Sequence, residues 1–512
     1  MIPDTITKGN LMFTNTIPRT SICFGIGLLS MLSCPAWAEQ GQGTVEVNRG
    51  PHLFIDDYLI AESEGVKKVT QHPKRVREGP ILGWREHTTQ PYLTVLRDPR
   101  SGLFRMWYNY DGGVDTAIAY AESNDGITWS LPTLNLMGPD NRLFKIGRSR
   151  EHGSYGVSVI DDGPDADDAA KRYKLMWWSG TSDPAGASVA FSPDGIHWTP
   201  SDEKPVMPFY PHDHPRAKIG VGDIVDAFHD PIRHRYGALI KLQAMESDGW
   251  KAGPRAGKSY RRLVGASFSD DFVHWAKPWR VIVPEPRDEG LLEFYGAGGT
   301  IARGPLLISF VRMLHDDYSP EPGGEPTGIG YTTLATSRDG VHWQRHNDIF
   351  FDRNPQPGTW DRAMTWVGGA LPVGDELYLY YGGYARGHKV EPTKERQLGL
   401  ATMPIDRFVC VEPSGDRSGT LRTIPLRLPA DAGTGLVLNA DASGGRVRVQ
   451  MRTADDGAVL RGFAFEDCEP VTSDGSRLPV RWKKDPQLPS GQQVRFEFEL
   501  MDAKLFAFEV AH

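Results

Sequence analysis

A repeat of about 70 residues constrains the fold of this 512-residue chain more than any other feature. The pattern S-x-D-x-x-x-W stands at residues 123–129, 192–198, 269–275 and 337–343, and a degenerate fifth copy aligns Met403 with Ser337. Self-similarity at a fixed period is the signature of a repeat architecture. The repeat therefore predicts five similar units in series.

The repeated motif has a structural interpretation. Ser and Asp side chains can hydrogen-bond to their own backbone and fix a turn, Gly relaxes that turn, and Trp anchors the next strand between units. We therefore expect these residues to build the scaffold and to take no part in chemistry.

Strand patterns precede every copy of the motif. The first unit offers PYLTVLRDP, LFRMWYNY and AIAYAES, in which apolar side chains alternate with period two and turn residues separate the segments. The other units repeat this order, and helical periodicity is nearly absent. The sequence thus predicts an all-β fold, with a five-bladed β-propeller at 80–411 and a small β-sandwich at 412–512. Residues 39–79 form a lead-in segment and a candidate source of a closing strand.

The N-terminal region predicts export. Lys8 and Arg19 precede an apolar run at 22–32, and Ala36-Trp37-Ala38 forms an A-x-A cleavage site, so we predict a signal peptide over 1–38. The run is shorter than the roughly 20 residues that span a bilayer. We expect a secreted or periplasmic monomer with no membrane contact after cleavage.

Composition and motif spacing exclude several other classes. A net charge of -8, with no basic stripe, argues against nucleic-acid binding. No spacing of His and Cys residues marks a zinc site, so no metal ligands are assigned. Cys410 and Cys468 remain after cleavage, and they either pair with each other or stay as two buried thiols.

Candidate site residues come from the segments just before each innermost strand, because these segments gather at one mouth of a propeller channel. The polar residues there are Arg85, Glu86 and His87 in the first unit, His152 in the second, Asp223 in the third, Glu293 in the fourth, and Asp361 and Arg362 in the fifth, with His388 after a later strand. Several convergent carboxylates are what glycoside hydrolysis needs.

With these residues, the chain resembles the five-bladed propeller glycosidases of glycoside hydrolase families 32, 43 and 130 over about 80–410, and its C-terminal part resembles the sandwich of family 32. In family 43 an acidic residue precedes the inner strand of each of the first three blades. Only Asp223 matches, at the place of the third-blade acid, since Gln90 and Ser154 occupy the other two positions. The resemblance allows a structural calcium ion in the channel, and no other cofactor is expected.

The predicted function is an exported glycoside hydrolase acting on a polysaccharide or oligosaccharide. Glu86 and Asp223 are the expected base and acid, and Glu293 is the third carboxylate. Tyr295 and Trp366 would stack on sugar rings, while Arg85, His87, His152, Asp361, Arg362 and His388 would bind polar groups of the substrate. A phosphorylase of similar fold, a polysaccharide lyase with a Tyr or His base, and a non-catalytic carbohydrate-binding propeller remain open.

Overall fold

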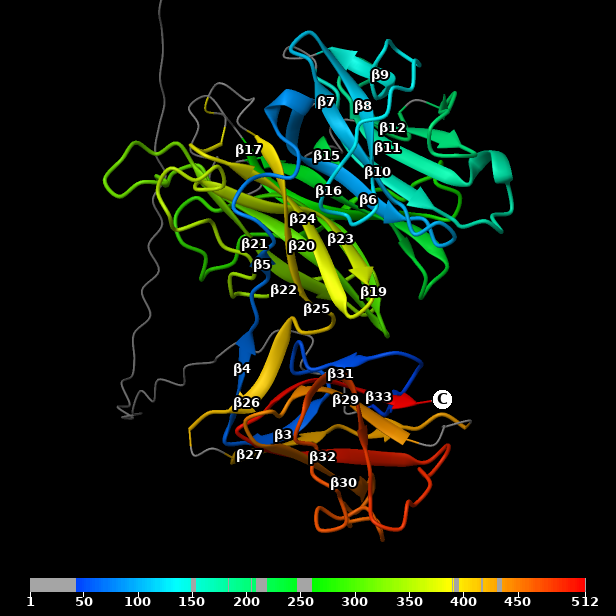
Figure 1. Ribbon diagram of the computed structural model, residues 1–512, viewed down its shortest axis with the longest axis vertical. Helices are drawn as coiled ribbons and strands as arrows, with labels where there is room; N and C mark the ends of the chain where they lie inside the picture. The colour runs from blue at the N-terminus through cyan, green and yellow to red at the C-terminus, as the bar shows by residue number, and fades with distance from the viewer. Residues whose placement is uncertain are drawn as a thin grey trace, which may run out of the picture. The chain divides into compact units, whose positions relative to one another are not determined.

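The computed structural model describes residues 43–148, 153–182, 184–203, 205–208, 219–245, 260–388, 390, 396–415, 418–430 and 435–511. The predicted signal peptide and His152 lie outside these ranges. Apart from two short 3-10 turns, η1 (Trp84–Glu86) and η2 (Ala169–Lys171), every described element is a strand (Figure 1). The all-β prediction is therefore confirmed.

Most strands between residues 74 and 404 form five antiparallel units, in which strands mostly pair in chain order. Unit 1 contains β6 (Thr88–Arg97), β7 (Phe104–Asp111), β8 (Asp115–Ser123) and β9 (Arg142–Arg148). Unit 2 contains β10 (Tyr155–Asp161), β11 (Tyr173–Ser179) and β12 (Gly186–Ser192), and both β13 (Thr199–Pro200) and β14 (Met207–Pro208) pair with β12. Unit 3 contains β15 (Ile219–Asp230), β16 (Arg235–Met245), β17 (Tyr260–Ser269) and β18 (Trp279–Ile282).

The last two units share one sheet, because Gly330 and Met364 form a parallel pair between them. Unit 4 contains β19 (Glu293–Arg303), β20 (Leu306–His315), β21 (Ile329–Ser337) and β22 (Gln344–Arg345). Unit 5 contains β23 (Met364–Val373), β24 (Glu376–Tyr384) and β25 (Gln397–Pro404). The lead-in adds β5 (Lys74–Arg75), which pairs with β25, so it does supply a strand to this unit.

The first strands of the units pack against one another in a closed order. Strand β6 contacts β10, β10 contacts β15, β15 contacts β19, β19 contacts β23, and β23 contacts β6. We call the end at which these five strands begin the mouth. Side chains between neighbouring units are apolar, as in the buried cluster formed by Met176, Val225, Leu239, Phe294 and Val311.

The repeated motif forms the predicted turn. In the first copy, Asp125 Oδ1 accepts hydrogen bonds from the N–H groups of Ile127 and Thr128 at 2.7 and 2.8 Å, and Ser123 Oγ accepts one from Gly126 at 2.9 Å. The fourth residue of the motif has a positive φ in each copy. In the degenerate fifth copy, where Ile405 replaces the Asp, this fourth residue is Asp406, with φ 65°. The alignment of Met403 with Ser337 therefore holds in three dimensions.

These turns make stability depend on pH in the acid range. Burial alone would raise the pKa of Asp194, but hydrogen bonds from the backbone and ring of His197 and from the backbone of Ile196 outweigh it and lower the pKa to about 2. A carboxyl whose pKa falls on folding stabilises the fold above its unfolded pKa, and this contribution is lost as the pH falls toward the folded value.

We therefore predict that Asp194→Asn lowers the free energy of unfolding above pH 4, and that its difference from wild type shrinks between pH 4 and pH 2. Urea titrations across this range would measure it. The exposed Asp165→Asn serves as the control for loss of one surface carboxylate. A constant difference between Asp194→Asn and wild type from pH 6 to pH 2 would contradict the prediction.

The C-terminal strands form two sheets together with strands of the lead-in (Figure 1). One sheet joins β1 (Val45–Glu46), β3 (Ile60–Glu64), β27 (Ser418–Thr423), β28 (Leu426–Arg427), β30 (Arg446–Thr453) and β32 (Gln493–Met501). The other joins β2 (His52–Leu53), β4 (Val66–Thr70), β26 (Val409–Pro413), β29 (Gly435–Asp441), β31 (Asp474–Val480) and β33 (Lys504–Ala511). Strands near the two ends of the described chain are thus direct neighbours.

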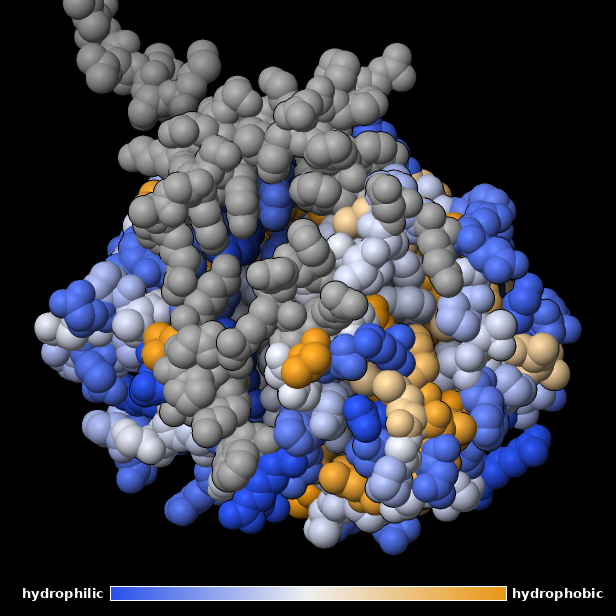
Figure 2. All heavy atoms as spheres, turned by 90° about the horizontal axis from the view of Figure 1, so that it is seen from above, coloured by the Kyte–Doolittle hydropathy of each residue, from blue (hydrophilic) through white to orange (hydrophobic). Residues whose placement is uncertain are grey.

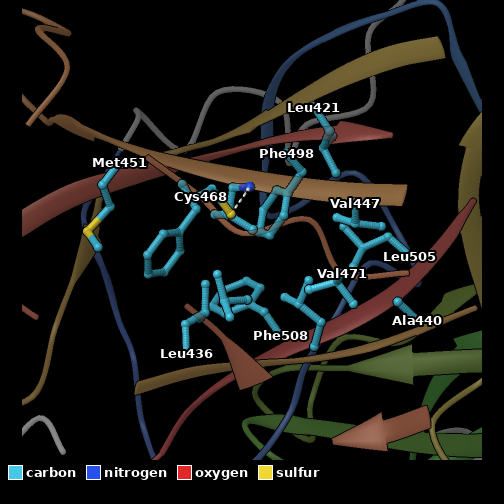
Figure 3. Close-up of a cluster of buried hydrophobic side chains, with 14 of the residues drawn as sticks. Leu421, Leu436, Ala440, Val447, Met451, Cys468, Val471, Phe498, Leu505 and Phe508 are labelled. Atoms are coloured by element: carbon cyan, nitrogen blue, oxygen red, sulfur yellow. Dashed lines mark hydrogen bonds between the residues drawn. The ribbon is translucent and has the colours of Figure 1, made fainter. Parts of the chain in front are cut away.

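A shared apolar core lies between these two sheets (Figure 3). Leu421 and Phe498 come from the first sheet, and Leu505 and Phe508 come from the second. Cys468 belongs to this core, and its sulfur accepts a hydrogen bond from the backbone of Val449 at 3.3 Å. Alternation of buried and half-buried residues along β32 explains why this strand faces the core with every second side chain.

Cys410 and Cys468 are both free and buried. Burial raises the pKa of the Cys410 thiol to about 12, and it also raises the pKa of Cys468. Of the two alternatives that the sequence left open, the structure shows the pair of buried thiols. Neither thiol is activated, because the thiolate is the reactive form and burial disfavours it.

Candidate functional site

The first strand of every unit carries a break in its pairing register near its start. The breaks lie between Thr88 and Leu93, Tyr155 and Ser158, Val221 and Val225, Phe294 and Ala297, and Val367 and Gly369. A β-bulge interrupts the strict alternation of side chains and turns a residue in a new direction. Each of these first strands therefore has an irregular segment near the mouth.

Residues from these irregular segments pack into one aromatic cluster, which we call the mouth cluster. It contains Tyr92, Ile224, Tyr295, Leu314, Ala363, Met364, Trp366 and Tyr384, with Tyr155 at its edge. The rings of Tyr295 and Trp366 are stacked, with centroids 4.6 Å apart and an interplanar angle of 13°. The Trp366 indole donates to the carbonyl of Met313 at 2.8 Å. Tyr295 and Trp366 are buried, so they form a packed floor.

Asp223 lies in the bulge of β15 and keeps 30% of its side chain exposed. The ammonium of buried Lys241, on β16, donates to its carboxylate. Gly222 makes this approach feasible, because a Cβ there would lie 2.5 Å from Lys241 Cε. The same ammonium lies 4.8 Å from the centroid of the Tyr295 ring. Asp223 and Lys241 thus form a close ion pair at the mouth.

Asp226 follows on the same strand and pairs with Arg312 of β20. The guanidinium donates to both carboxylate oxygens, at 2.9 and 2.8 Å, and its Nε donates to the carbonyl of Val367 at 3.0 Å. Arg312 passes over Gly298, where a Cβ would lie 2.4 Å from both Arg312 Nη2 and Asp226 Oδ1. Burial raises the pKa of Asp226 above its ordinary value, although Arg312 acts in the opposite direction.

Glu293 belongs to a fully buried network below the mouth. Its carboxylate accepts hydrogen bonds from the backbone N–H of Arg262 at 3.0 Å and from Arg262 Nη1 at 2.6 Å. The same Nη1 lies 3.6 Å from Asp316 Oδ2, and Asp316 Oδ1 lies 2.8 Å from Nδ1 of His388. The rings of His388 and Tyr295 pack edge to face, with their centroids 5.0 Å apart. The network therefore connects Glu293 and His388 to the mouth cluster.

The predicted residues of unit 1 lie in other surroundings. Glu86 is half-buried, and its Oε2 accepts a hydrogen bond from the backbone of Gly83 at 2.7 Å. His87 is exposed, has a φ of 56°, and lies 4.7 Å from the Tyr110 ring. Arg85 is exposed as well. Among the residues that the structure describes, Glu86 and His87 contact Gly83, Tyr108 and Tyr110 of unit 1 and its leading turn, and these contacts do not reach the mouth cluster.

Asp361 and Arg362 point to different partners. Asp361 is completely buried, and its Oδ2 accepts from Arg75 Nε at 2.6 Å and from the Tyr381 hydroxyl at 3.2 Å. Arg362 donates to both carboxylate oxygens of Glu321, at 3.0 and 3.2 Å. Asp361 thus joins lead-in strand β5 to unit 5. Of the predicted site residues, the structure brings together Asp223, Glu293, Tyr295, Trp366 and His388.

Sequence reasoning missed Lys241, Asp226 and Arg312. A signal existed: Asn109, Lys241 and Arg312 each lie five residues after the residue that pairs with a motif serine. All three are buried polar residues in otherwise apolar strands. Buried polar side chains at one position of a repeat indicate a shared role, because each must find a polar partner.

No group of three or more potential metal ligands occurs among the residues that the structure describes. Within the same ranges, no helix has the length and apolar character needed to cross a membrane.

Comparisons with known proteins give structural matches only, since no family model and no curated protein matches the chain. A glycosyl hydrolase from Bacteroides ovatus is 15% identical, with a TM-score of 0.42, over 66% of this chain and 94% of the other. A member of the GH130 family, which is described as containing hydrolases that target β-1,2 mannosidic linkages in Candida mannan, is 14% identical, with a TM-score of 0.41. The match covers 66% of this chain and 95% of the other. A β-1,2-mannobiose phosphorylase from Listeria innocua is 12% identical, with a TM-score of 0.42, over 66% of this chain and 98% of the other.

Proposed function

We propose that the five units form a five-bladed β-propeller whose mouth carries the active site. The closed order of contacts among β6, β10, β15, β19 and β23 supports this architecture. The recurrence of the motif turn at the end of each unit supports it as well. In a propeller, the first strand of each blade lines the central channel. The bulged residues at the mouth would then face one common site.

We further propose that the protein cleaves glycosidic bonds of a polysaccharide or oligosaccharide. One observation carries this proposal: β15 presents two partly exposed carboxylates, Asp223 in its bulge and Asp226 just after it, and each is held by a buried cation of a second strand, Lys241 or Arg312. Asp223 is paired with the ammonium of Lys241, whereas burial raises the pKa of Asp226 against the opposing effect of Arg312. Carboxyl groups whose surroundings separate their proton affinities provide an acid and a base.

In this proposal Asp226 acts as the general acid and passes a proton to the leaving glycosidic oxygen. Asp223 activates a water molecule or attacks the anomeric carbon directly. Arg312 fixes the orientation of Asp226, and Lys241 fixes that of Asp223. Glu293 is completely buried, so we assign it the positioning of Arg262 beneath the site. Glu86 remains the predicted alternative base.

The N-terminal sequence supports a proposed location outside the cytoplasm, as a secreted or periplasmic monomer. The A-x-A site before Glu39 is the feature that supports it.

The test is to incubate the purified protein with a panel of glycans and aryl glycosides and to measure released sugar. We expect turnover by wild type and its loss in Asp223→Asn. The matched control is Asp98→Asn, because Asp98 accepts backbone hydrogen bonds from Arg100 and Ser101 in an exposed turn, and we expect it to keep wild-type turnover. Glycan binding without turnover by wild type would instead identify a carbohydrate-binding propeller. Full activity of Asp223→Asn would overturn its catalytic role.

A further inference from the structure

A cavity lies between the lead-in and the beginning of β20. Its volume is about 270 Å³, and it is lined by Thr44, Val45, Glu46, Asn48, Pro51, His52, Leu53, Tyr58, Leu59, Pro305, Leu306 and Arg338. We call it the junction pocket. Ligand pockets for drug-sized molecules measure roughly 300–1,000 Å³, so this cavity suits a ligand of about one sugar ring.

Close backbone contacts support the wall of the junction pocket. A Cβ at Gly304 would lie 2.2 Å from the carbonyl oxygen of Pro51, and one at Gly50 would lie 3.3 Å from Gly304 Cα. Leu53 and Leu306 belong to one buried apolar cluster. The lead-in and unit 4 are therefore packed directly against each other at this place, and the pocket is preformed.

The charges around the junction pocket are balanced. Arg338 donates to both carboxylate oxygens of Asp56, at 2.6 and 2.8 Å. Glu46 accepts from Arg427 Nε at 3.1 Å. Burial lowers the pKa of His52 to about 4, so this imidazole is neutral at physiological pH. Each charged group of the lining thus has an opposite partner, and the pocket favours an uncharged ligand over a uronate or sulfated sugar.

The polar and aromatic groups of the pocket match a hydroxylated ring. Tyr58 is 47% exposed, and the Arg338 guanidinium lies 3.9 Å from the centroid of its ring. The guanidinium has five N–H donors, and it shows two hydrogen bonds to Asp56. Asn48 is exposed and offers both a donor and an acceptor. An exposed tyrosine ring beside a guanidinium and an amide offers the kinds of group that contact the C–H surface and the hydroxyls of a sugar ring.

We infer that the junction pocket is a carbohydrate-binding site for one neutral sugar unit of the glycan on which the mouth acts, an inference that rests on the proposed function. The pocket would hold a second part of a long chain and raise its local concentration, because linked binding events reinforce each other. It takes no part in bond cleavage, and small substrates do not need it.

The test uses full-length Asp223→Asn, in which binding is measured without turnover. Cellobiose, xylobiose, mannobiose and sucrose are the neutral probes, with digalacturonic acid as the charged comparison, and saturation-transfer NMR and calorimetry detect binding. We expect a neutral probe to bind, and Tyr58→Ala and the pocket-filling Asn48→Trp to weaken it at least tenfold. The matched control is Leu131→Ala, an exposed apolar residue outside the pocket, which should bind as before. Thermal melting confirms that each variant is folded.

Two results would overturn the inference: equal binding by Tyr58→Ala, Asn48→Trp and the control, or tighter binding of digalacturonic acid than of every neutral probe. The wild-type turnover assay separates this outcome from failure of the proposed function. If wild type shows turnover and the pocket variants bind the probe as tightly as the control, the junction pocket is rejected and the proposed function stands. Weakened binding in those variants, with no turnover by wild type, supports the pocket and rejects the enzyme.

Discussion

Asp226→Asn is expected to lower kcat by about 10²–10⁴-fold, which is the usual contribution of a general acid or base, and to leave KM near the wild-type value. Asn occupies the same space as Asp and can still accept a hydrogen bond from Arg312, but it has no proton to give to a leaving oxygen. The measurement is steady-state kinetics on the best substrate of the glycan panel. Asp98→Asn again provides the control for loss of one carboxylate.

The pH dependence of Asp226 has a defined sign. Burial raises its pKa, and the acid acts in its protonated form, so wild-type kcat is lost as the pH rises through that pKa. Arg312 lowers the pKa of Asp226, so Arg312→Gln should move this alkaline limb to higher pH. Asp226→Asn should lack the limb in its residual activity. Retention of both kcat and the limb by Asp226→Asn would contradict the assignment.

Glu293→Ala is expected to destabilise the protein by about 3–5 kcal/mol, because it removes a carboxylate that accepts two hydrogen bonds from buried Arg262, and breaking a buried ion pair is costly. Arg262 is only 2% exposed, and Glu293 supplies its 2.6 Å contact. Asp316 remains 3.6 Å away, but it already contacts His388. Urea unfolding followed by tryptophan fluorescence measures the effect.

An exposed pair provides the comparison for Glu293. Arg477 contacts Glu509 at 2.6 Å, with 58% of the arginine side chain exposed, so Arg477→Ala should cost about 0–1 kcal/mol. Adding Arg262→Met to Glu293→Ala should recover part of the loss, because the second change removes the buried cation that Glu293 contacted. A cost for Glu293→Ala as small as that for Arg477→Ala would show that the buried network does not hold the site together.

Much of the scaffold follows from local sequence. The motif turns, the order of strands and the alignment of the fifth copy depend on residues close together in the chain, and the positive φ of Asp406 agrees with that alignment. The pairing of β3 with β27 and of β4 with β26 had no comparable signal. Only one residue of β3, Ile60, is not exposed, so this strand shows no alternation that would reveal a partner.

The site was harder to predict because bulges break the alternation on which pattern reasoning depends. Asp223 could be predicted because it stands just before the apolar part of an inner strand. Asp226 lies within that part, where the alternating pattern predicts a side chain that points away from the site. Lys241 and Arg312 reach the mouth from second strands, over Gly222 and Gly298. Glycine has no side chain, so these two positions leave room for the cations. From sequence alone, a glycine in a strand indicates only a weak strand position.

The pairing of lead-in strands with C-terminal strands also determines when the protein can complete its fold during synthesis. Strand β4 ends at Thr70, and its neighbour β26 begins only at Val409. At roughly 5–20 residues per second, a ribosome needs tens of seconds to make the intervening chain. Throughout that interval the edges of β3 and β4 lack their partners and are open to pairing with other chains. The nascent protein therefore depends on whatever shields this segment until its last strands emerge.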